Sequence, residues 1–504
     1  MHSIIIKSLI ISLVMILFTA CNEKNESQKE SIAKSNDIQK KIKELELKEL
    51  TTKALEDKKQ DIKTANMDTQ EVASYPLQEL NKTSSIATKK TINNFDFDII
   101  KKGYKDDNTL LIVGGIQGDE PGGFMAASLI STHYKITKGS VWVVPNLNFY
   151  SIIKRSRGPY GDMNRKFANL SKNDPEYETI QRIKSYIGDK SVKLIVNLHD
   201  GSGFYRPTYE DKTHSPYKWG QCSIIDQEKL KNKHYSNLAE IANQVNAHVN
   251  KSLLKKEHIY HLHNTRTVEG DKEMEKTLTY YAINQGKSAF GNEASKSLPT
   301  HQRVYYHLLA LEKYMDIMGI EFERKFKLND YAVKNILDND IEISLYNDKI
   351  KLPLSKIRNV LKYFPITKDG KIDFIPSNPL MSIVKVKDEY VIYYGNRRVS
   401  ILRADYIDME NNKRLVKLNI DSKDANIQFG TTVKVDNDFK IYPIKDYRVN
   451  VIGYTNKNKN ETNISIKHNK MQKKFSIDKF GKTYRVEFYT KDKFAGMILV
   501  NFTG

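Results

Sequence analysis

The sequence predicts an α/β domain with a mixed, largely buried sheet, followed by two small all-β domains. Two observations support this fold class. Between residues 93 and 322, short and almost wholly apolar runs alternate with longer helix-like stretches, which is typical of strands covered by helices on both faces. After residue 325, short runs of alternating apolar and polar residues are separated by Asn, Asp, Lys and Gly, as in small β-domains.

Four apolar runs are the expected strands of the α/β domain, and three stretches between and after them are its expected helices. The strands are TLLIVGG at 109–115, SVWVVPNLN at 140–148, VKLIVNLHD at 192–200 and SAFGNE at 288–293. The helices are PGGFMAASLISTHY, YETIQRIKSYIG and HQRVYYHLLALEKYMDIMG. The last helix closes the domain near residue 320.

Beyond the α/β domain we expect one β-domain over 325–425 and another over 430–504. The first contains DIEISLY, IKLPLS, LMSIVKVKDEYVIYYG and RRVSILRADYI, and the second contains VNVIGYTN, ISIKHN, YRVEFYT and AGMILVNF. The length and strand spacing of the second are similar to those of an immunoglobulin-like sandwich.

The first 92 residues differ from the rest. Residues 1–21 combine one lysine, an apolar run and small residues that end at Cys21, which indicates a bacterial lipoprotein signal. An uncleaved anchor and an ordinary signal peptide are the alternatives, and all three would export the protein to the periplasm. Residues 22–92 are rich in Lys, Glu, Gln, Asn and Ser. This composition favours a charged tether between membrane and enzyme, with a short coiled coil as the alternative.

Composition limits the classes of partner. The net charge of +20 suits nucleic acid, anionic lipid or an acidic wall polymer. The sequence contains no P-loop, zinc-finger spacing or aromatic RNA-binding motif, so we expect no nucleic-acid partner. The only cysteines are Cys21 and Cys222. Lipidation of Cys21 would leave Cys222 alone, which excludes a disulfide framework and a cysteine-based zinc site.

Polar side chains with metal-binding chemistry follow two of the expected strands. Gln117 and Glu120 come after the first strand, at a spacing that points both side chains the same way at the start of a helix. His199 ends another strand. In open α/β sheets ligands bind outside the carboxyl ends of the strands. Three protein ligands with an open position for water are typical of catalytic zinc, so we expect Gln117, Glu120 and His199 to hold one zinc ion.

The stretches GGIQGDEPGG, SRGPYGDMNRKF and NLHDGSGFYRP resemble zinc metallocarboxypeptidases of the carboxypeptidase A type. They are closest to the peptidoglycan DL-carboxypeptidases that determine helical cell shape. The resemblance covers roughly residues 95–320, and the trailing pair of β-domains also fits this subgroup. Gln117-x-x-Glu120 stands where the wider family has His-x-x-Glu, and a similar Gln occurs in the subgroup. Both ligand types are neutral, so the Lewis acidity of the zinc is retained, although an amide oxygen binds zinc less strongly than imidazole does.

The resemblance also implies roles for residues outside the metal site. Glu293 corresponds to the catalytic glutamate, which takes a proton from water and passes it to the leaving amine. Arg165 and Asn164 correspond to the pair that clamps the terminal carboxylate of the substrate, because a guanidinium can bond both oxygens. Arg157 corresponds to the residue that stabilises the oxyanion, and Arg155 is the neighbour that could be confused with it.

Further candidates lie near these motifs. Trp219 and Thr279 are expected to line the substrate pocket, with simple packing as the alternative for each. His258, His261 and His263 alternate in HIYHLHNTR, and we interpret them as histidines of a strand or loop rather than as a second metal site.

The expected function is that of a periplasmic zinc carboxypeptidase that removes terminal meso-diaminopimelate from peptidoglycan stem tripeptides and so affects cell shape. The expected partners are stem peptides, the membrane through a lipid or signal anchor, and cell-shape proteins. Three alternatives remain at this point: an amidohydrolase of small acylated amino acids, a non-catalytic wall-binding protein that kept the fold, and a nucleic-acid-binding protein. Accessory β-domains favour a polymer substrate over the first, and an export signal opposes the last.

Overall fold

The computed structural model of the chain describes residues 89–410, 415–455 and 460–504. The predicted signal segment, the lipidation site Cys21 and the predicted tether up to residue 88 lie outside the described residues. Within the described part of the chain, no helix is both long enough and apolar enough to cross a membrane.

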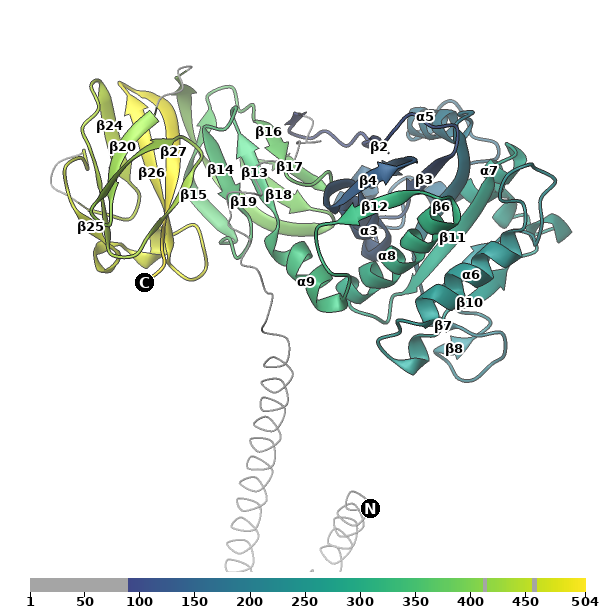
Figure 1. The fold of residues 1–504 in the computed structure, drawn as a ribbon. Helices are drawn as coiled ribbons and strands as arrows, with labels where there is room; N and C mark the ends of the chain where they lie inside the picture. The colour runs from purple at the N-terminus through teal and green to yellow at the C-terminus, as the bar shows by residue number, and fades with distance from the viewer. Residues whose placement is uncertain (1–88, 411–414, 456–459) are drawn as a thin grey trace, which may run out of the picture. The chain divides into compact units, whose positions relative to one another are not determined.

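A mixed seven-stranded sheet forms the centre of the α/β domain (Figure 1). Its strands are β2 (Ile100–Gly103), β3 (Thr109–Val113), β5 (Ser140–Val144), β6 (Val192–Gly201), β9 (Cys222–Ile225), β10 (His261–Asn264) and β11 (Ser288–Ser295). They lie in the order β10–β9–β11–β6–β3–β5–β2. The four strands β11, β6, β3 and β5 run parallel, whereas β9 and β2 are antiparallel to β11 and β5. The predicted mixed sheet is confirmed.

Helices cover both faces of this sheet (Figure 1). One face carries α3 (Pro121–His133), α6 (Leu238–Asn250) and α8 (Thr300–Ile317), and the other carries α5 (Tyr177–Ile187) and α7 (Leu278–Asn284). Leu110 and Ile112 of β3 lie in the first core, whereas Leu111 and Val113 lie in the second. Since side chains of a strand alternate between faces, a strand covered on both sides is apolar throughout. The three predicted helices are confirmed as α3, α5 and α8.

The middle β-domain (residues 342–409) contains two sheets. One holds β13 (Glu342–Leu345), β14 (Ile350–Pro353) and β16 (Asp373–Pro376), and the other holds β15 (Val360–Thr367), β17 (Met381–Val386), β18 (Glu389–Tyr394) and β19 (Arg397–Met409). Its buried side chains belong to the same hydrophobic cluster as those of α3 and α8. The α/β domain and the middle β-domain therefore share one core.

Two elements near this domain differ from the sequence prediction. Helix α9 (Asp330–Asn339) lies in the segment predicted to be all-β. It forms because Val333 and Leu337 bury one face at helical spacing, and the side chain of Asn329 caps the first turn. Strand β1 (Lys90–Thr91) lies within the predicted tether but pairs with β16.

The C-terminal domain is a sandwich of two layers of four strands each, and its first layer joins the larger sheet of the middle β-domain to form one eight-stranded sheet. The first layer contains β22 (Thr432–Val435), β24 (Tyr447–Val451), β26 (Thr483–Thr490) and β27 (Lys493–Phe502), and the second contains β20 (Leu415–Ile420), β21 (Lys423–Gln428), β23 (Asp438–Ile441) and β25 (Ile466–Lys467). Val416 and Phe439 of the second layer pack in the same core as Val486 and Val500 of the first. Because β20 pairs with β23, this sandwich starts before the predicted boundary at 425–430. Its immunoglobulin-like character stays a prediction.

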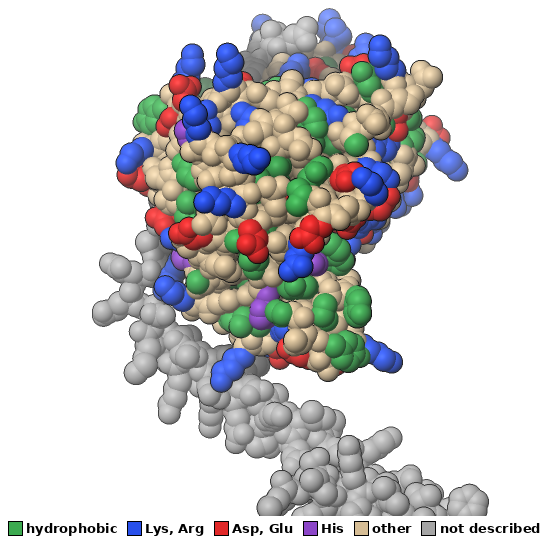
Figure 2. Space-filling model, turned by 90° about the vertical axis from the view of Figure 1, so that its right-hand side faces the viewer, with side chains coloured by type: hydrophobic (Ala, Val, Ile, Leu, Met, Phe, Trp, Pro, Cys, Tyr) green, Lys and Arg blue, Asp and Glu red, His purple; other side chains and the backbone are tan. Residues whose placement is uncertain are grey.

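Smaller elements complete the structure. Strand β4 (Tyr134–Lys138) pairs with β12 (Glu321–Arg324), β7 (Phe204–Tyr205) pairs with β8 (His214–Ser215), and the short helix α4 (Phe149–Lys154) follows β5. On the face drawn in Figure 2, lysine and arginine side chains lie interspersed with aspartate and glutamate. Positive charge on this face is therefore dispersed.

Candidate active site

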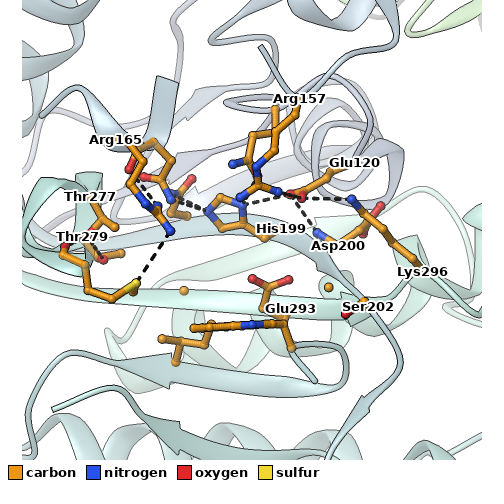
Figure 3. Close-up of a pocket in the computed structure, with 18 residues that line it drawn as sticks. Glu120, Arg157, Arg165, His199, Asp200, Ser202, Thr277, Thr279, Glu293 and Lys296 are labelled. Atoms are coloured by element: carbon orange, nitrogen blue, oxygen red, sulfur yellow. Dashed lines mark hydrogen bonds and ion pairs between the residues drawn. The ribbon is translucent and has the colours of Figure 1, made fainter. Parts of the chain in front are cut away.

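A cavity of about 300 Å³ opens at the carboxyl ends of β3, β6 and β11 (Figure 3). This is the edge at which an open α/β sheet binds its ligands. All nine residues that the sequence assigns to the metal site, the catalytic group and the substrate pocket line it: Gln117, Glu120, Arg157, Asn164, Arg165, His199, Trp219, Thr279 and Glu293. The structure thus brings them together, while their individual roles stay predictions.

The three predicted metal ligands point donor atoms at one another. Nδ1 of His199 lies 2.9 Å from Oε2 of Glu120 and 3.2 Å from Oε1 of Gln117. All three side chains are buried. One imidazole nitrogen, one carboxylate oxygen and one amide oxygen form a donor set that suits zinc. In the described part of the chain, no group of three His, Cys, Asp or Glu side chains could hold a metal ion, so a site here depends on the glutamine.

The second ring nitrogen of His199, Nε2, has a neighbour that can set the tautomer which a metal ligand needs. Nε2 of His199 lies 2.8 Å from the side-chain nitrogen of Asn197, whose Oδ1 is buried without a hydrogen-bond partner among the described residues. An Asn197 amide turned by 180° would accept a hydrogen bond from Nε2–H through that oxygen. Such a bond fixes the tautomer that leaves Nδ1 free to bind a metal.

Asp162 holds the glutamine ligand in orientation. Nε2 of Gln117 donates to Oδ1 of Asp162 at 2.7 Å, so its amide oxygen faces His199. Asp162 also accepts from Nε of Arg157 and from the backbone N–H of Asn164, both at 2.9 Å. Burial alone would raise the pKa of Asp162, but the bond from Gln117 and the charge of Arg157 lower it below its usual value. The sequence analysis missed Asp162, whose only local signal is its place just before the Asn164–Arg165 pair.

The ligand loop, residues 114–120, carries Gln117 and Glu120. Its glycines let it pass between α3 and α4. Gly115 has φ +74°, which favours glycine. A Cβ on Gly118 would lie 2.1 Å from the carbonyl oxygen of Ser151 in α4. The Gly118 N–H donates to the carbonyl of Ser156 at 2.9 Å and to Oγ of Ser151 at 3.1 Å. This close approach places Gln117 and Glu120 at the mouth of the cavity, directly before α3.

Glu293 faces the metal donors from the neighbouring strand. It pairs in register with His199 of β6 and with Cys222 of β9, and it points toward His199 (Figure 3). The side chain is buried, and its Oε2 has no hydrogen-bond partner within the described residues. Burial raises the pKa of Glu293 to about 8; His199 opposes this rise, while Glu120 adds to it. A free carboxyl oxygen near the metal donors is what a general base requires.

Three cations line the cavity. Arg157 lies 3.5 Å from Glu120, and the Arg165 guanidinium donates to the Asn164 carbonyl at 3.1 Å. The Asn164 side chain accepts from the N–H of Leu278 at 3.0 Å, which fixes its amide. Lys296, which the sequence analysis missed, lies 2.8 Å from Asp119 and 3.3 Å from Glu120. A cavity with three cations suits an anionic substrate.

The structure separates Arg157 from its neighbour Arg155. Arg157 lines the cavity, whereas Arg155 ends α4 with φ +54° and its Nε donates to the backbone carbonyl of Asn396. The lining also includes Asn197, Asp200 and Thr277, which the sequence analysis did not single out. Asp200 is held by the Gly122 N–H and by Arg303, each at 2.7 Å, so its contacts are structural.

The two weaker pocket candidates also have packing contacts. The Trp219 ring lies 4.8 Å from that of His263, and Oγ1 of Thr279 lies 3.2 Å from that of Thr277. His263 stacks on Tyr205 with centroids 4.1 Å apart. Burial lowers the pKa of His263 to about 4. His258 and His261 also contact aromatic rings, those of Phe204, Tyr306 and Tyr205.

Comparisons with known proteins agree with this geometry. The family described as the catalytic domain of carboxypeptidases controlling helical cell shape matches residues 78–338. The C-terminal domain of metallo-carboxypeptidases matches residues 409–503. No curated protein matches the chain.

Among solved structures, the apo form of cell shape determinant protein Csd4 from Helicobacter pylori is 43% identical, with a TM-score of 0.74. The match covers 81% of this chain and 100% of that chain. The tripeptide-bound form of Csd4 gives the same values. The mDAP-bound form, described as a D,L-carboxypeptidase, is 44% identical over 80% of this chain and 100% of that chain, again with a TM-score of 0.74.

Proposed function

Because the chain belongs to the family of carboxypeptidases that control helical cell shape, we propose that it removes terminal meso-diaminopimelate from peptidoglycan stem tripeptides with one zinc ion. The observation that carries the proposal is the convergence of Gln117, Glu120 and His199, with Glu293 facing them from the next strand. The solved forms of Csd4 bound to a tripeptide and to mDAP support this substrate class.

The metal would be held by Nδ1 of His199, a carboxyl oxygen of Glu120 and the amide oxygen of Gln117. The chemistry that zinc supplies in such a site is polarisation of the scissile carbonyl and a lower pKa of bound water. Asn197, with its amide turned so that Oδ1 accepts from Nε2–H, would keep His199 in the required tautomer, and Asp162 keeps the Gln117 oxygen turned toward the site.

Glu293 would carry the proton. Its Oε2, which has no hydrogen-bond partner among the residues that the structure describes, accepts a proton from the attacking water and delivers it to the amine of the departing diaminopimelate. This group must lie near the metal without binding it, and its position on β11 beside His199 supports that role.

The cations would bind and orient the substrate. Arg165 and Asn164 hold the terminal carboxylate, which restricts cleavage to the last residue of the peptide. Arg157, held by Asp162 at 2.9 Å, stabilises the oxyanion of the tetrahedral intermediate. Trp219 and Thr279 line the pocket that receives the substrate.

We also propose that the protein acts in the periplasm, attached to the membrane through Cys21. Support comes from the sequence of residues 1–21 and from a wall-peptide substrate, which lies outside the cytoplasmic membrane. Partner proteins that act on cell shape belong to the same proposal.

Muropeptide digestion tests the function. The protein without residues 1–21 is incubated with disaccharide tripeptide, tetrapeptide and pentapeptide, and the products are identified by mass spectrometry. We expect loss of diaminopimelate from the tripeptide only, abolished by a chelator and restored by zinc. Absence of cleavage of any of the three, with zinc supplied, would contradict the proposal.

A further inference from the structure

The turn between β18 and β19, residues Gly395 and Asn396, contacts the loop that carries two of the predicted metal ligands. The side-chain nitrogen of Asn396 donates to the carbonyl of Gly118, at 3.4 Å. Arg155 donates in turn to the carbonyl of Asn396. Gly118 lies between Gln117 and Glu120 in the chain, so a side chain of the middle β-domain bonds the backbone of the ligand loop itself.

The same turn also packs against α3, the helix that follows the ligand loop. Gly395 has φ +54°, and a Cβ there would lie 2.6 Å from Met125 and 2.8 Å from Phe124. Its N–H donates to the carbonyl of Leu380 at 2.8 Å, which ties the turn to its own domain. The turn is therefore fitted closely against the first turns of α3, directly after Glu120.

The backbone of Gly118 is held from two sides. Its N–H bonds α4 and the residue Ser156 just beyond it, and its carbonyl bonds Asn396. The N–H belongs to the peptide unit that joins Gln117 to Gly118, and the carbonyl belongs to the unit that joins Gly118 to Asp119. The two contacts therefore hold the loop on either side of Gly118, toward Gln117 and toward Glu120. Only one of them belongs to the α/β domain.

The interface that holds the turn in place is apolar and continuous. Phe124 and Met125 of α3 share a buried cluster with Leu380 and Tyr394 of the middle β-domain. Asn378 adds a bond of 3.3 Å to Ser128 of α3. Domains move relative to each other by default unless their interface is large and hydrophobic, and a shared core of this kind opposes such motion.

We propose that the middle β-domain is part of the scaffold of the active site, and that Asn396 is a positioning residue acting through Gly118. The turn fixes the backbone between Gln117 and Glu120, so that both ligands are held ready for the metal. This inference rests on the metal site of the proposed function, and it gives the middle β-domain a role in metal binding.

Zinc affinity of the whole protein tests the inference. Asn396→Ala and the isosteric Asn396→Asp both remove the donor to Gly118. We expect each to raise the zinc dissociation constant by about tenfold, measured by competition with a chromophoric chelator, which is the low end of the effects of supporting contacts around metal ligands. Thermal unfolding of the metal-free protein should change little. Saturating zinc should restore kcat, which a general loss of stability would not allow.

Asn419→Ala is the matched control. Asn419 bonds Asp424 at 2.7 Å in the C-terminal sandwich, so its loss should leave zinc affinity unchanged. If Asn396→Ala fails to fold, Arg155→Ala removes the second bond of the turn and should give the same loss. If folded Asn396→Ala binds zinc with the affinity of the unaltered protein, the inference is overturned. Failure of the unaltered protein to bind zinc would instead contradict the proposed function.

Discussion

Asp162 accepts a 2.7 Å hydrogen bond from the side-chain amide of Gln117, and this contact decides which end of the amide faces His199. An amide is close to symmetric in shape, so a glutamine ligand needs such a partner to present oxygen rather than nitrogen. The partner must be an acceptor, and an ionised carboxylate supplies that without ambiguity. The low pKa of Asp162, set by Gln117 and Arg157 against the effect of burial, keeps it ionised.

Loss of Asp162 should therefore weaken metal binding although the three ligands remain. We expect Asp162→Ala to raise the zinc dissociation constant by about 10- to 100-fold. Asp162→Asn, which keeps one acceptor oxygen, should fall between Asp162→Ala and the unaltered protein. Competition with a chromophoric chelator measures both. Equal affinities for all three proteins would show that Gln117 orients itself without Asp162.

The catalytic role of Glu293 can be separated from metal binding. Glu293→Gln keeps the shape of the side chain and removes the base, so kcat should fall by at least about 100-fold. Zinc content, measured by elemental analysis, should stay at the level of the unaltered protein. Cys222→Ala is the matched control, because Cys222 pairs in register with Glu293 and its thiol donates to the Trp219 carbonyl. Unchanged kcat in Glu293→Gln would remove it from the mechanism.

Local sequence patterns were sufficient to predict the ligand-bearing elements of the fold. Strands β3 and β6 are mostly apolar up to their carboxyl ends because both of their faces are buried, and Glu120, His199 and Glu293 stand near or beyond the carboxyl ends of β3, β6 and β11. A functional residue at a strand end is visible from the sequence, because the strand and the residue are neighbours in the chain.

Contacts between distant segments were not visible in this way. Asn396 is 278 positions from Gly118, and no periodicity connects them. Strand β1 pairs with β16 across a similar separation. Lys296 could not be distinguished from the other lysines and arginines, 81 in total, because only the fold shows which cation faces the cavity. Helix α9 was missed because its apolar stripe is short and lies among residues that otherwise alternate.

The clamp on the terminal carboxylate can be tested with two substrates. Arg165→Ala should lower kcat/KM for the tripeptide by about 10- to 100-fold, since a hydrogen bond between charged groups is lost. Arg165→Lys should recover little, because an ammonium cannot make the two parallel bonds of a guanidinium. A tripeptide with an amidated C-terminus serves as control. The unaltered enzyme should cleave it poorly, and Arg165→Ala should lower that rate no further. A similar loss on both substrates would show that Arg165 acts elsewhere.

Arg485 and Glu487 form a buried ion pair at the junction of the two β-domains. Arg485 of β26 lies 3.1 Å from Glu487, and it donates to the carbonyls of Tyr363 and Lys362 in β15 at 3.1 and 3.0 Å. Both charged side chains are buried. Arg485→Met would leave a buried carboxylate without its cation and two carbonyls without a donor, so the free energy of unfolding should fall by about 3–5 kcal/mol. Denaturant unfolding measures this loss.

Glu487→Gln is the informative second variant at this junction. Burial raises the pKa of Glu487 despite the nearby charge of Arg485. A raised pKa in the folded state means that this group favours folding at pH below its unfolded value and ceases to do so as the pH rises through its folded value. In the Arg485→Met background, Glu487→Gln should therefore recover part of the lost stability at neutral pH, and it should recover less in acid, where Glu487 is already protonated. Strictly additive effects of the two substitutions would show that the pair is not coupled.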